Sequence, residues 1–320
     1  MAKAEQIKAL INSHLKRDDE KFVSIALQLA ASEARKGHTG LANEIRSLID
    51  DKKSRPVAVV SISNDLSDLV QESAPQSDVS SLVVSDALKA RISRITKEFG
   101  QAEKLAKHGL TNRRKILLSG PPGTGKTMTA AALAKQTGLP FFTVQIDRLV
   151  TKYLGETGAK LRQIFAMIRK RPGVYLFDEF DAIGAQRGLE SDVGEMRRVL
   201  NALLQFIETD DSHSIIVAAT NNLGSLDSAL FRRFDDILYY EKPTQSETLS
   251  LLRNRLGSFL GRFSLDTPAQ IADGLSHAEI AQACDDAIKD AVLSDRSKVT
   301  QKSLVQMLKD RKQTYTIINE

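Results

Sequence analysis

The sequence has few cysteines, few aromatic residues and no long apolar run, and each shortage excludes a class of protein. Its single cysteine, Cys284, cannot form a disulfide within the chain, which argues against a disulfide-stapled secreted domain. Aromatic residues make up 5% of the 320 residues, and no apolar stretch approaches the roughly 20 residues that a membrane span needs. The N-terminal residues have no apolar signal core. We therefore expect a soluble, cytoplasmic protein without a membrane span.

Other absences concern chemistry. The net charge is +5, but the basic residues are spread out and form no dense patch with aromatics, so nucleic-acid binding is not favoured. The five histidines are scattered and form no H-E-x-x-H motif, so the chain shows no metalloprotease site of its own. The spacing of Ile280, Cys284 and Ile288 predicts the apolar face of a helix, with the cysteine in the core.

The chain divides into four segments by composition. Residues 1–53 carry three helical apolar stripes and predict a small three-helix bundle. Residues 54–80 are rich in serine and contain no aromatic; they predict a flexible linker or, alternatively, a docked extended segment. In residues 81–242, short apolar runs alternate with helical patterns, which predicts an α/β core with a parallel sheet covered on both faces. Residues 243–320 predict helices only.

Two capping boxes mark helix starts in this last segment. Thr244 is followed by Glu247, and Ser276 by Glu279. At a helix N-terminus, a Ser or Thr side chain accepts a hydrogen bond from the backbone N–H of a Glu three residues later, and the Glu side chain accepts one from the backbone N–H of the Ser or Thr. We therefore expect a helical lid after the α/β core.

The octapeptide GPPGTGKT, residues 120–127, follows the apolar run KILLS and precedes a helical pattern. This context suits the phosphate-binding G-x-x-x-x-G-K-[ST] loop, in which glycines let backbone amides surround phosphate oxygens. We assign the lysine to the β and γ phosphates of ATP and the threonine to Mg²⁺. The predicted nucleotide-binding residues here are Gly120, Pro121, Pro122, Gly123, Thr124, Gly125, Lys126, Thr127 and Met128.

Polar residues end the later apolar runs. Asp178 and Glu179 follow VYLF, and ligands of parallel sheets bind at the C-terminal ends of strands. We predict that Asp178 completes the Mg²⁺ site with the threonine and that Glu179 polarises the attacking water. Asn221 could orient water or contact the γ phosphate, or could be a turn residue. Arg232 and Arg233 could stabilise the transferred phosphoryl group, or could form a surface pair.

The order of GPPGTGKT, VYLFDEF, AATN, ALFRRFDD and GLSHAEI resembles the AAA module of the AAA+ ATPases over residues 85–315. The resemblance implies a five-stranded parallel core with a C-terminal helical lid and ATP bound between them. It also implies a homo-oligomeric ring, usually a hexamer, in which Arg232 and Arg233 reach the neighbouring subunit's nucleotide.

The resemblance adds nucleotide contacts at Gly109, His277 and Ala278. In relatives the lid motif reads G-[FY]-S-G-A-[DE], and His277 stands in place of its second glycine. The detailed adenine contact at this position is therefore open.

The stretch TKYLGETGAKL, residues 151–161, places an aromatic and an aliphatic residue where a loop is expected. In the protein-remodelling branch of the AAA family, a loop of aromatic, hydrophobic and glycine residues projects into a central pore and grips polypeptide. Lys152, Tyr153, Leu154 and Gly155 resemble that loop. The alternative is that the two apolar side chains pack beneath the loop, since exposing each costs about 1.5 to 3 kcal/mol.

These features favour an ATP-driven protein remodeller or unfoldase. The whole chain resembles stand-alone bacterial AAA ATPases that are encoded beside a subtilisin-like serine peptidase, some in phage-defence or toxin–antitoxin pairs. This implies a separately encoded peptidase as partner. A DNA-acting helper ATPase, of the transposition or helicase-loading type, and an ATP-dependent switch that gates a partner are the alternatives. Tyr153 and the arginine pair favour the first reading over DNA, and Glu179 disfavours a non-hydrolysing switch.

Overall fold

The computed structural model describes residues 25, 26, 29, 30, 32, 40, 44, 66, 68–74, 82–149, 154–180, 190–222 and 231–318. The chain forms two compact units, Met1–Val60 and Ser61–Glu320. The described residues of the first unit are helical, and Ala26 and Ala30 are buried. The rest of the bundle expected over residues 1–53 lies outside the described residues.

The second unit contains a six-stranded sheet in the order β1-β3-β4-β5-β2-β6. Neighbouring strands are parallel except β1, which is antiparallel to β3. The apolar runs that predicted strands form β2 to β6, so the parallel part of the core is confirmed. The expected sheet of five parallel strands is corrected to a mixed sheet with an added edge strand. The strands are β1 (Val70–Ser73), β2 (Lys115–Ser119), β3 (Phe141–Val144), β4 (Val174–Phe177), β5 (Ile215–Thr220) and β6 (Asp236–Tyr239).

The added strand β1 comes from the segment expected to be a linker. Val70 lies opposite Val144 and Ser73 opposite Phe141, so this part of residues 54–80 is a docked extended segment. Only the first residue of β1 is buried. A strand of four residues with one buried side chain has no alternating pattern long enough to stand out in the sequence.

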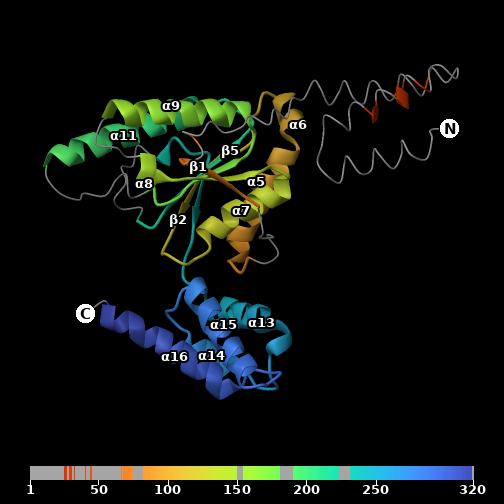
Figure 1. The fold of residues 1–320 in the computed structure, drawn as a ribbon, viewed down its shortest axis with the longest axis vertical. Helices are drawn as coiled ribbons and strands as arrows, with labels where there is room; N and C mark the ends of the chain where they lie inside the picture. The colour runs from red at the N-terminus through yellow and green to blue at the C-terminus, as the bar shows by residue number, and fades with distance from the viewer. Residues whose placement is uncertain are drawn as a thin grey trace. The chain divides into compact units, whose positions relative to one another are not determined.

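Helices cover both faces of the sheet (Figure 1). Helices α8, α9 and α11 form an apolar core with one face of the sheet, and α5 and α7 form a second core with the opposite face. The central strands β4 and β5 are buried at every position, which explains their continuous apolar runs. The helices are α5 (Asp86–Gly100), α6 (Ala102–Ala106), α7 (Lys126–Thr137), α8 (Ile146–Leu149), α9 (Leu154–Lys170) and α11 (Glu190–Thr209).

After β6 the described chain is helical and packs about a third apolar core. Both predicted capping boxes form, Thr244 with Glu247 and Ser276 with Glu279. Cys284 is fully buried in this core, and burial raises the pKa of its thiol to about 12. We find no helix among the described residues that could span a membrane. The C-terminal helices are α13 (Gln245–Leu256), η3 (Gly257–Phe259), α14 (Asp266–Ile271), α15 (His277–Leu293) and α16 (Gln301–Ile318).

Candidate nucleotide-binding site

The phosphate loop joins the C-terminal end of β2 to the first turn of α7, and two of its glycines lie where an added side chain would be sterically crowded. Gly120 and Gly123 have φ of 152° and 74°, where side chains are disfavoured. A Cβ at Gly120 would lie 2.2 Å from the carbonyl oxygen of Tyr240. A Cβ at Gly123 would lie 2.7 Å from Oγ of Ser276. The loop therefore passes closely between the end of β6 and the start of α15, and a side chain at either position would force neighbouring atoms to shift.

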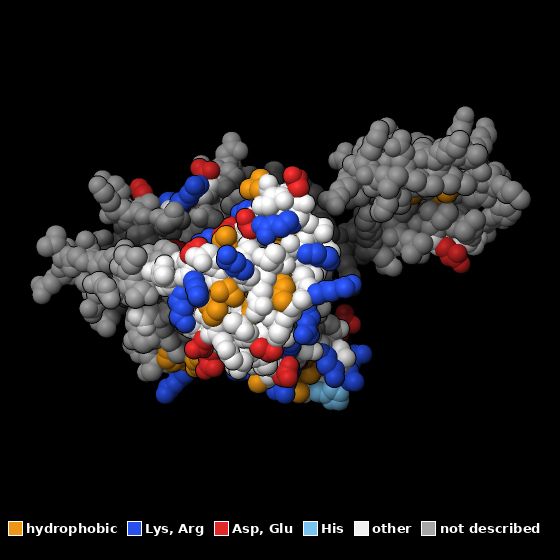
Figure 2. Space-filling model, turned by 90° about the horizontal axis from the view of Figure 1, so that it is seen from below, with side chains coloured by type: hydrophobic (Ala, Val, Ile, Leu, Met, Phe, Trp, Pro, Cys, Tyr) orange, Lys and Arg blue, Asp and Glu red, His pale blue; other side chains and the backbone are white. Residues whose placement is uncertain are grey.

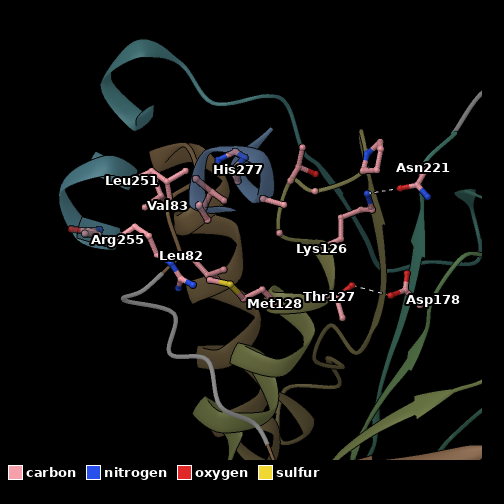
Figure 3. A pocket seen from close by; sticks show the side chains of 18 of the residues that line it. Leu82, Val83, Lys126, Thr127, Met128, Asp178, Asn221, Leu251, Arg255 and His277 are labelled. Atoms are coloured by element: carbon pink, nitrogen blue, oxygen red, sulfur yellow. Dashed lines mark hydrogen bonds between the residues drawn. The ribbon is translucent and has the colours of Figure 1, made fainter. Parts of the chain in front are cut away.

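Lys126 is the first residue of α7 and is 7% exposed. Its Nζ donates hydrogen bonds to the carbonyl oxygens of Gly120 and Pro121, at 2.7 and 2.9 Å, and to Oδ1 of Asn221, at 2.8 Å. Figure 3 shows the lysine and the asparagine pointing toward each other across the loop. Two residues predicted from separate motifs thus meet at one point, beside the end of β5.

Thr127 and Asp178 also meet. Oγ1 of Thr127 donates to Oδ2 of Asp178 at 2.8 Å, as drawn in Figure 3. Mg²⁺ in nucleotide sites takes one or two oxygen ligands from the protein and the others from phosphate and water. The chemistry and proximity of these two oxygens therefore fit such an ion.

Glu179 follows on an uncommon backbone. Its φ is +53°, a value that few residues other than glycine adopt and that concentrates at functional sites. Two hydrogen bonds hold the turn: N of Glu179 donates to Oδ1 of Asp178 at 2.9 Å, and N of Phe180 donates to the carbonyl oxygen of Ala219 at 2.8 Å. The turn leaves Glu179 exposed, on the wall of the cavity described next.

A cavity of about 980 Å³ lies between the phosphate loop and the C-terminal helices. One end carries the polar groups described above. The other end is lined by apolar side chains, among them Leu82, Val83, Met128, Leu251 and Ala281 (Figure 3). Ligand cavities of about 300 to 1,000 Å³ commonly combine an apolar wall with a few converging polar groups. The two ends suit the base and the phosphates of a nucleotide.

His277 and Ala278 enter this cavity from the first turn of α15. N of Ala278 donates to the carbonyl oxygen of Gly123 at 2.9 Å, which ties the C-terminal helices to the phosphate loop. Burial lowers the pKa of His277, against the opposing effects of the Glu247 carboxylate and the Val83 carbonyl. The imidazole is therefore biased toward its neutral form.

Arg232 and Arg233 lie near the N-terminal ends of the parallel strands, whereas the phosphate loop and Glu179 follow the C-terminal ends. The nearby Asp235 accepts a hydrogen bond from N of Lys115, the first residue of β2, at 2.9 Å, whereas the phosphate loop follows the last residue of that strand. A strand of this length spans roughly 13 Å. The structure therefore does not bring the arginine pair to the other predicted site residues of the same chain. Arg232 is exposed, and Nε of Arg233 lies 3.3 Å from the carboxylate of Glu208.

The remaining predicted residues lie elsewhere. Gly109 lies in the turn after α6 and is not among the described residues that line the cavity. Lys152 and Tyr153 lie outside the described residues. Helix α9 begins at Leu154, so Leu154 and Gly155 belong to its first turn and not to a loop. An acidic residue in that turn favours a helix N-terminus there.

Sequence reasoning missed part of the cavity wall. Leu82 and Val83 precede α5, and Leu251, Asn254 and Arg255 lie on α13. The spacing of Leu251 and Arg255 puts both on one face of a helix, but any amphipathic helix has such pairs. No local signal separates a wall of this kind from an ordinary packing surface.

Comparisons with known proteins identify the family of the chain. Residues 116–242 match the family described as ATPase family associated with various cellular activities (AAA). An AAA family ATPase of Sinorhizobium fredii, y4kL, itself uncharacterized, is 34% identical over 317 residues. That match covers 97% of this chain and 96% of the relative.

Two further relatives match a smaller part of the chain. FtsH 3 of Sphaerobacter thermophilus, an ATP-dependent zinc metalloprotease, is 33% identical over 71% of this chain and 47% of its own length. A proteasome-activating nucleotidase of Saccharolobus islandicus is 35% identical over 62% of this chain and 52% of its own length. The chain thus spans about half the length of these two relatives. The end-to-end similarity to y4kL, the family match over the α/β core and the ATP-type phosphate loop together show that the chain belongs to the AAA family of ATPases.

Proposed function

We propose that the protein works as a homo-oligomeric ring, usually a hexamer in this family, that uses ATP hydrolysis to remodel or unfold other proteins. The observation that carries this proposal is that the predicted site residues lie at opposite ends of the parallel strands. The phosphate loop and Glu179 follow the C-terminal ends of the strands, and Arg232 and Arg233 lie near the N-terminal ends. An arginine that reaches the γ phosphate can raise the rate of hydrolysis about 10³- to 10⁵-fold. A second copy of the chain can supply the arginine that a single copy cannot.

Within one subunit the residues divide the work of hydrolysis. Lys126 binds the β and γ phosphates, and Thr127 and Asp178 hold Mg²⁺, which neutralises phosphate charge when bound. Glu179 accepts a proton from the attacking water, and Asn221 orients that water. The hydrogen bond between Lys126 and Asn221 supports this assignment, because the two side chains meet at the polar end of the cavity.

The polypeptide substrate is supported by the kind of relative that this chain resembles. One is named as a protease and another as an activator of the proteasome. This chain has no H-E-x-x-H motif, so any proteolysis needs a partner, which we propose to be a separately encoded, subtilisin-like serine peptidase in the cytoplasm, with phage defence as one setting. Residues 1–53 would select the target, and Tyr153 would line the pore.

The DNA-acting alternative gains no support from the surface. On the face that Figure 2 shows, Lys and Arg side chains are interspersed with Asp and Glu. Nucleic-acid affinity depends on neutralising several phosphates together, which requires basic residues clustered on one face or in one groove.

The proposal is tested with Glu179→Gln, which should retain ATP and remain bound to its polypeptide. Affinity capture with this variant should recover a polypeptide that wild type releases. Glu103→Gln serves as control, because Glu103 is an exposed acid on α6 away from the cavity. In parallel, unfolded protein should stimulate the wild-type ATPase, and single-stranded DNA should not. Stimulation by DNA alone would contradict the proposal.

The role of Tyr153 has its own test. Tyr153→Ala should abolish unfolding of a tagged substrate at an unchanged melting temperature, and Tyr153→Phe should retain it, because a grip on varied chains uses the ring and not the hydroxyl. If the ring instead packs within the subunit, alanine should lower stability by about 3 to 5 kcal/mol. A destabilised protein, or normal unfolding without the ring, would contradict the pore assignment.

A further inference from the structure

The edge strand β1 is attached to the part of the core that leads into the proposed substrate-gripping segment. Strand β3 is followed by the short helix α8, and residues 150–153 come next in the chain, before α9. Any element that sets the position of α8 therefore sets where the chain enters residues 150–153.

The residues at the start of β1 contact α8 at both of its ends. N of Gln145, just before α8, donates to the carbonyl oxygen of Leu69 at 2.9 Å. Nη1 of Arg148, near the end of α8, donates to the carbonyl oxygen of Asp68 at 3.2 Å. A further bond comes from α9, where Nζ of Lys160 donates to the carbonyl oxygen of Arg148 at 2.9 Å.

Apolar packing joins the same two elements. Leu69 and Val70 are 4% and 1% exposed, and they belong to the same apolar core as Ile146 and Leu149 of α8. A helix of four residues is a single turn, which is too short to be stable by itself. Its position therefore depends on its neighbours, and the β1 segment supplies both hydrogen-bond acceptors and buried side chains.

The other end of β1 is fixed to the residue that follows α9. Nη2 of Arg171 donates to both carboxylate oxygens of Glu72, each at 2.9 Å. The guanidinium also lies 4.7 Å from the centre of the Phe142 ring, and the hydroxyl of Tyr175 donates to the carbonyl oxygen of Arg171 at 2.7 Å. β1 is thus tied to α8, which precedes residues 150–153, and to the end of α9, the helix that follows them.

We propose that Asp68, Leu69 and strand β1 form a positioning segment, which stays docked on β3 and holds α8 so that residues 150–153 act on polypeptide when ATP is hydrolysed. The proposal rests on the proposed function of Tyr153. It assigns to the segment expected to be a linker a part in substrate handling. Because the chain enters β1 from the unit Met1–Val60, the strand also connects that unit to the substrate-handling elements.

The test uses the full chain with Leu69→Asp, which places a charge in the apolar core beneath β1 and should undock the strand. Leu69→Ile is the matched control. We expect ATP turnover without polypeptide to stay within about twofold of wild type for Leu69→Asp, while unfolding of a tagged fluorescent protein falls by about tenfold or more. Leu69→Ile should behave as wild type in both assays.

A charge swap repeats the test without placing a charge beneath β1: the side chain of Glu72 is 44% exposed and that of Arg171 is 21% exposed. Glu72→Arg faces Arg171 with a like charge and should lower unfolding, and the double variant Glu72→Arg/Arg171→Glu should recover it. Tyr153→Ala is run in parallel. If the β1 variants unfold substrate at the wild-type rate while Tyr153→Ala fails, the positioning role is overturned and the proposed function stands. If Tyr153→Ala unfolds substrate normally, the pore role of Tyr153 fails, and if the wild-type protein does not unfold substrate, the proposed function itself fails.

One more outcome would overturn the positioning role. If ATP turnover falls in step with unfolding in both single variants, and the charge swap recovers neither, β1 supports only the fold of the sheet. Recovery of unfolding by the charge swap at constant ATP turnover is the result that a purely structural strand does not produce.

Discussion

Replacing Gly123 with alanine should weaken ATP binding by separating the phosphate loop from the C-terminal helices. Gly123 has φ of +74°, and an added Cβ would lie 2.7 Å from Oγ of Ser276 and 3.0 Å from Cβ of Ala278. The same glycine accepts the hydrogen bond from N of Ala278, at 2.9 Å. The methyl group therefore pushes against the backbone hydrogen bond that joins α15 to the loop.

The magnitude follows from two terms. Overpacking of a tight contact typically costs about 1 to 3 kcal/mol, and loss of a hydrogen bond costs about 0.5 to 1.5 kcal/mol. The free protein relieves the contact by moving α15 away from the loop, but a nucleotide that touches both must bring them back. The cost then appears in binding. A loss of about 2 to 3 kcal/mol corresponds to an increase of roughly 30- to 140-fold in Kd for ATP.

Gly138→Ala is the matched control. Gly138 ends α7 with φ of +68°, and nothing lies within 4 Å of its added Cβ. It carries the same backbone strain, about 1 to 2 kcal/mol, without the contact to α15. Isothermal titration with ATP and thermal melting on both variants separate the two effects. If Gly123→Ala binds ATP no more weakly than Gly138→Ala, the argument from the loop–α15 contact is wrong.

Three other predictions concern the same site. Lys126→Ala should abolish ATP binding, whereas Glu179→Gln should bind ATP and hydrolyse it about 10²- to 10⁴-fold more slowly, as filter binding and phosphate release would show; comparable turnover would exclude Glu179 as the base. Wild-type turnover should rise faster than linearly with protein concentration as rings assemble, and Arg232→Ala should lower it about 10³-fold or more with binding kept; a fully active monomer would refute the shared site. The pKa of His277 is lowered in the folded state, so the unfolded state binds more protons between that pKa and about 6.5, and the free energy of unfolding should fall on acidification through this range. Urea unfolding of His277→Gln should show a smaller fall than wild type. An equal fall would contradict the lowered pKa of His277.

The phosphate end of the cavity was predictable because each of its residues is placed by its own local sequence. The run KILLS forms β2, and the glycines that follow need unusual φ values, so the loop is encoded within a few residues. Asp178, Glu179 and Asn221 each end an apolar run, and parallel strands bring such ends to one edge. These residues lie near Lys126 and Thr127 because of the order of the strands in the sheet, and the order of the motifs along the chain implies that strand order.

The base end and the edge strand were not predictable in this way. Leu82 and Leu251 are apolar residues beside or within helices, and their shared cavity arises only when α13 and α15 pack against the loop. The turn at Glu179, with its positive φ, is likewise fixed by a contact with a neighbouring strand, because N of Phe180 donates to the carbonyl oxygen of Ala219 on β5. Features that depend on contacts between distant segments leave no local pattern, whereas strand ends and capping boxes do.

The same contrast decides where the catalytic unit begins. Composition alone places the boundary near residue 81, but Leu69 and Val70 are buried in the core of the sheet. Burying each side chain contributes about 1.5 to 3 kcal/mol, so cutting the chain at residue 81 would remove about 3 to 6 kcal/mol, a large part of the 5 to 15 kcal/mol that keeps most domains folded. A chain that begins at residue 61 should therefore have a melting temperature close to that of the full-length chain and keep ATP turnover. A chain that begins at residue 81 should have a melting temperature well below that of the full-length chain. Equal melting temperatures would show that β1 contributes little to the core, and would remove the physical basis for treating it as more than a linker.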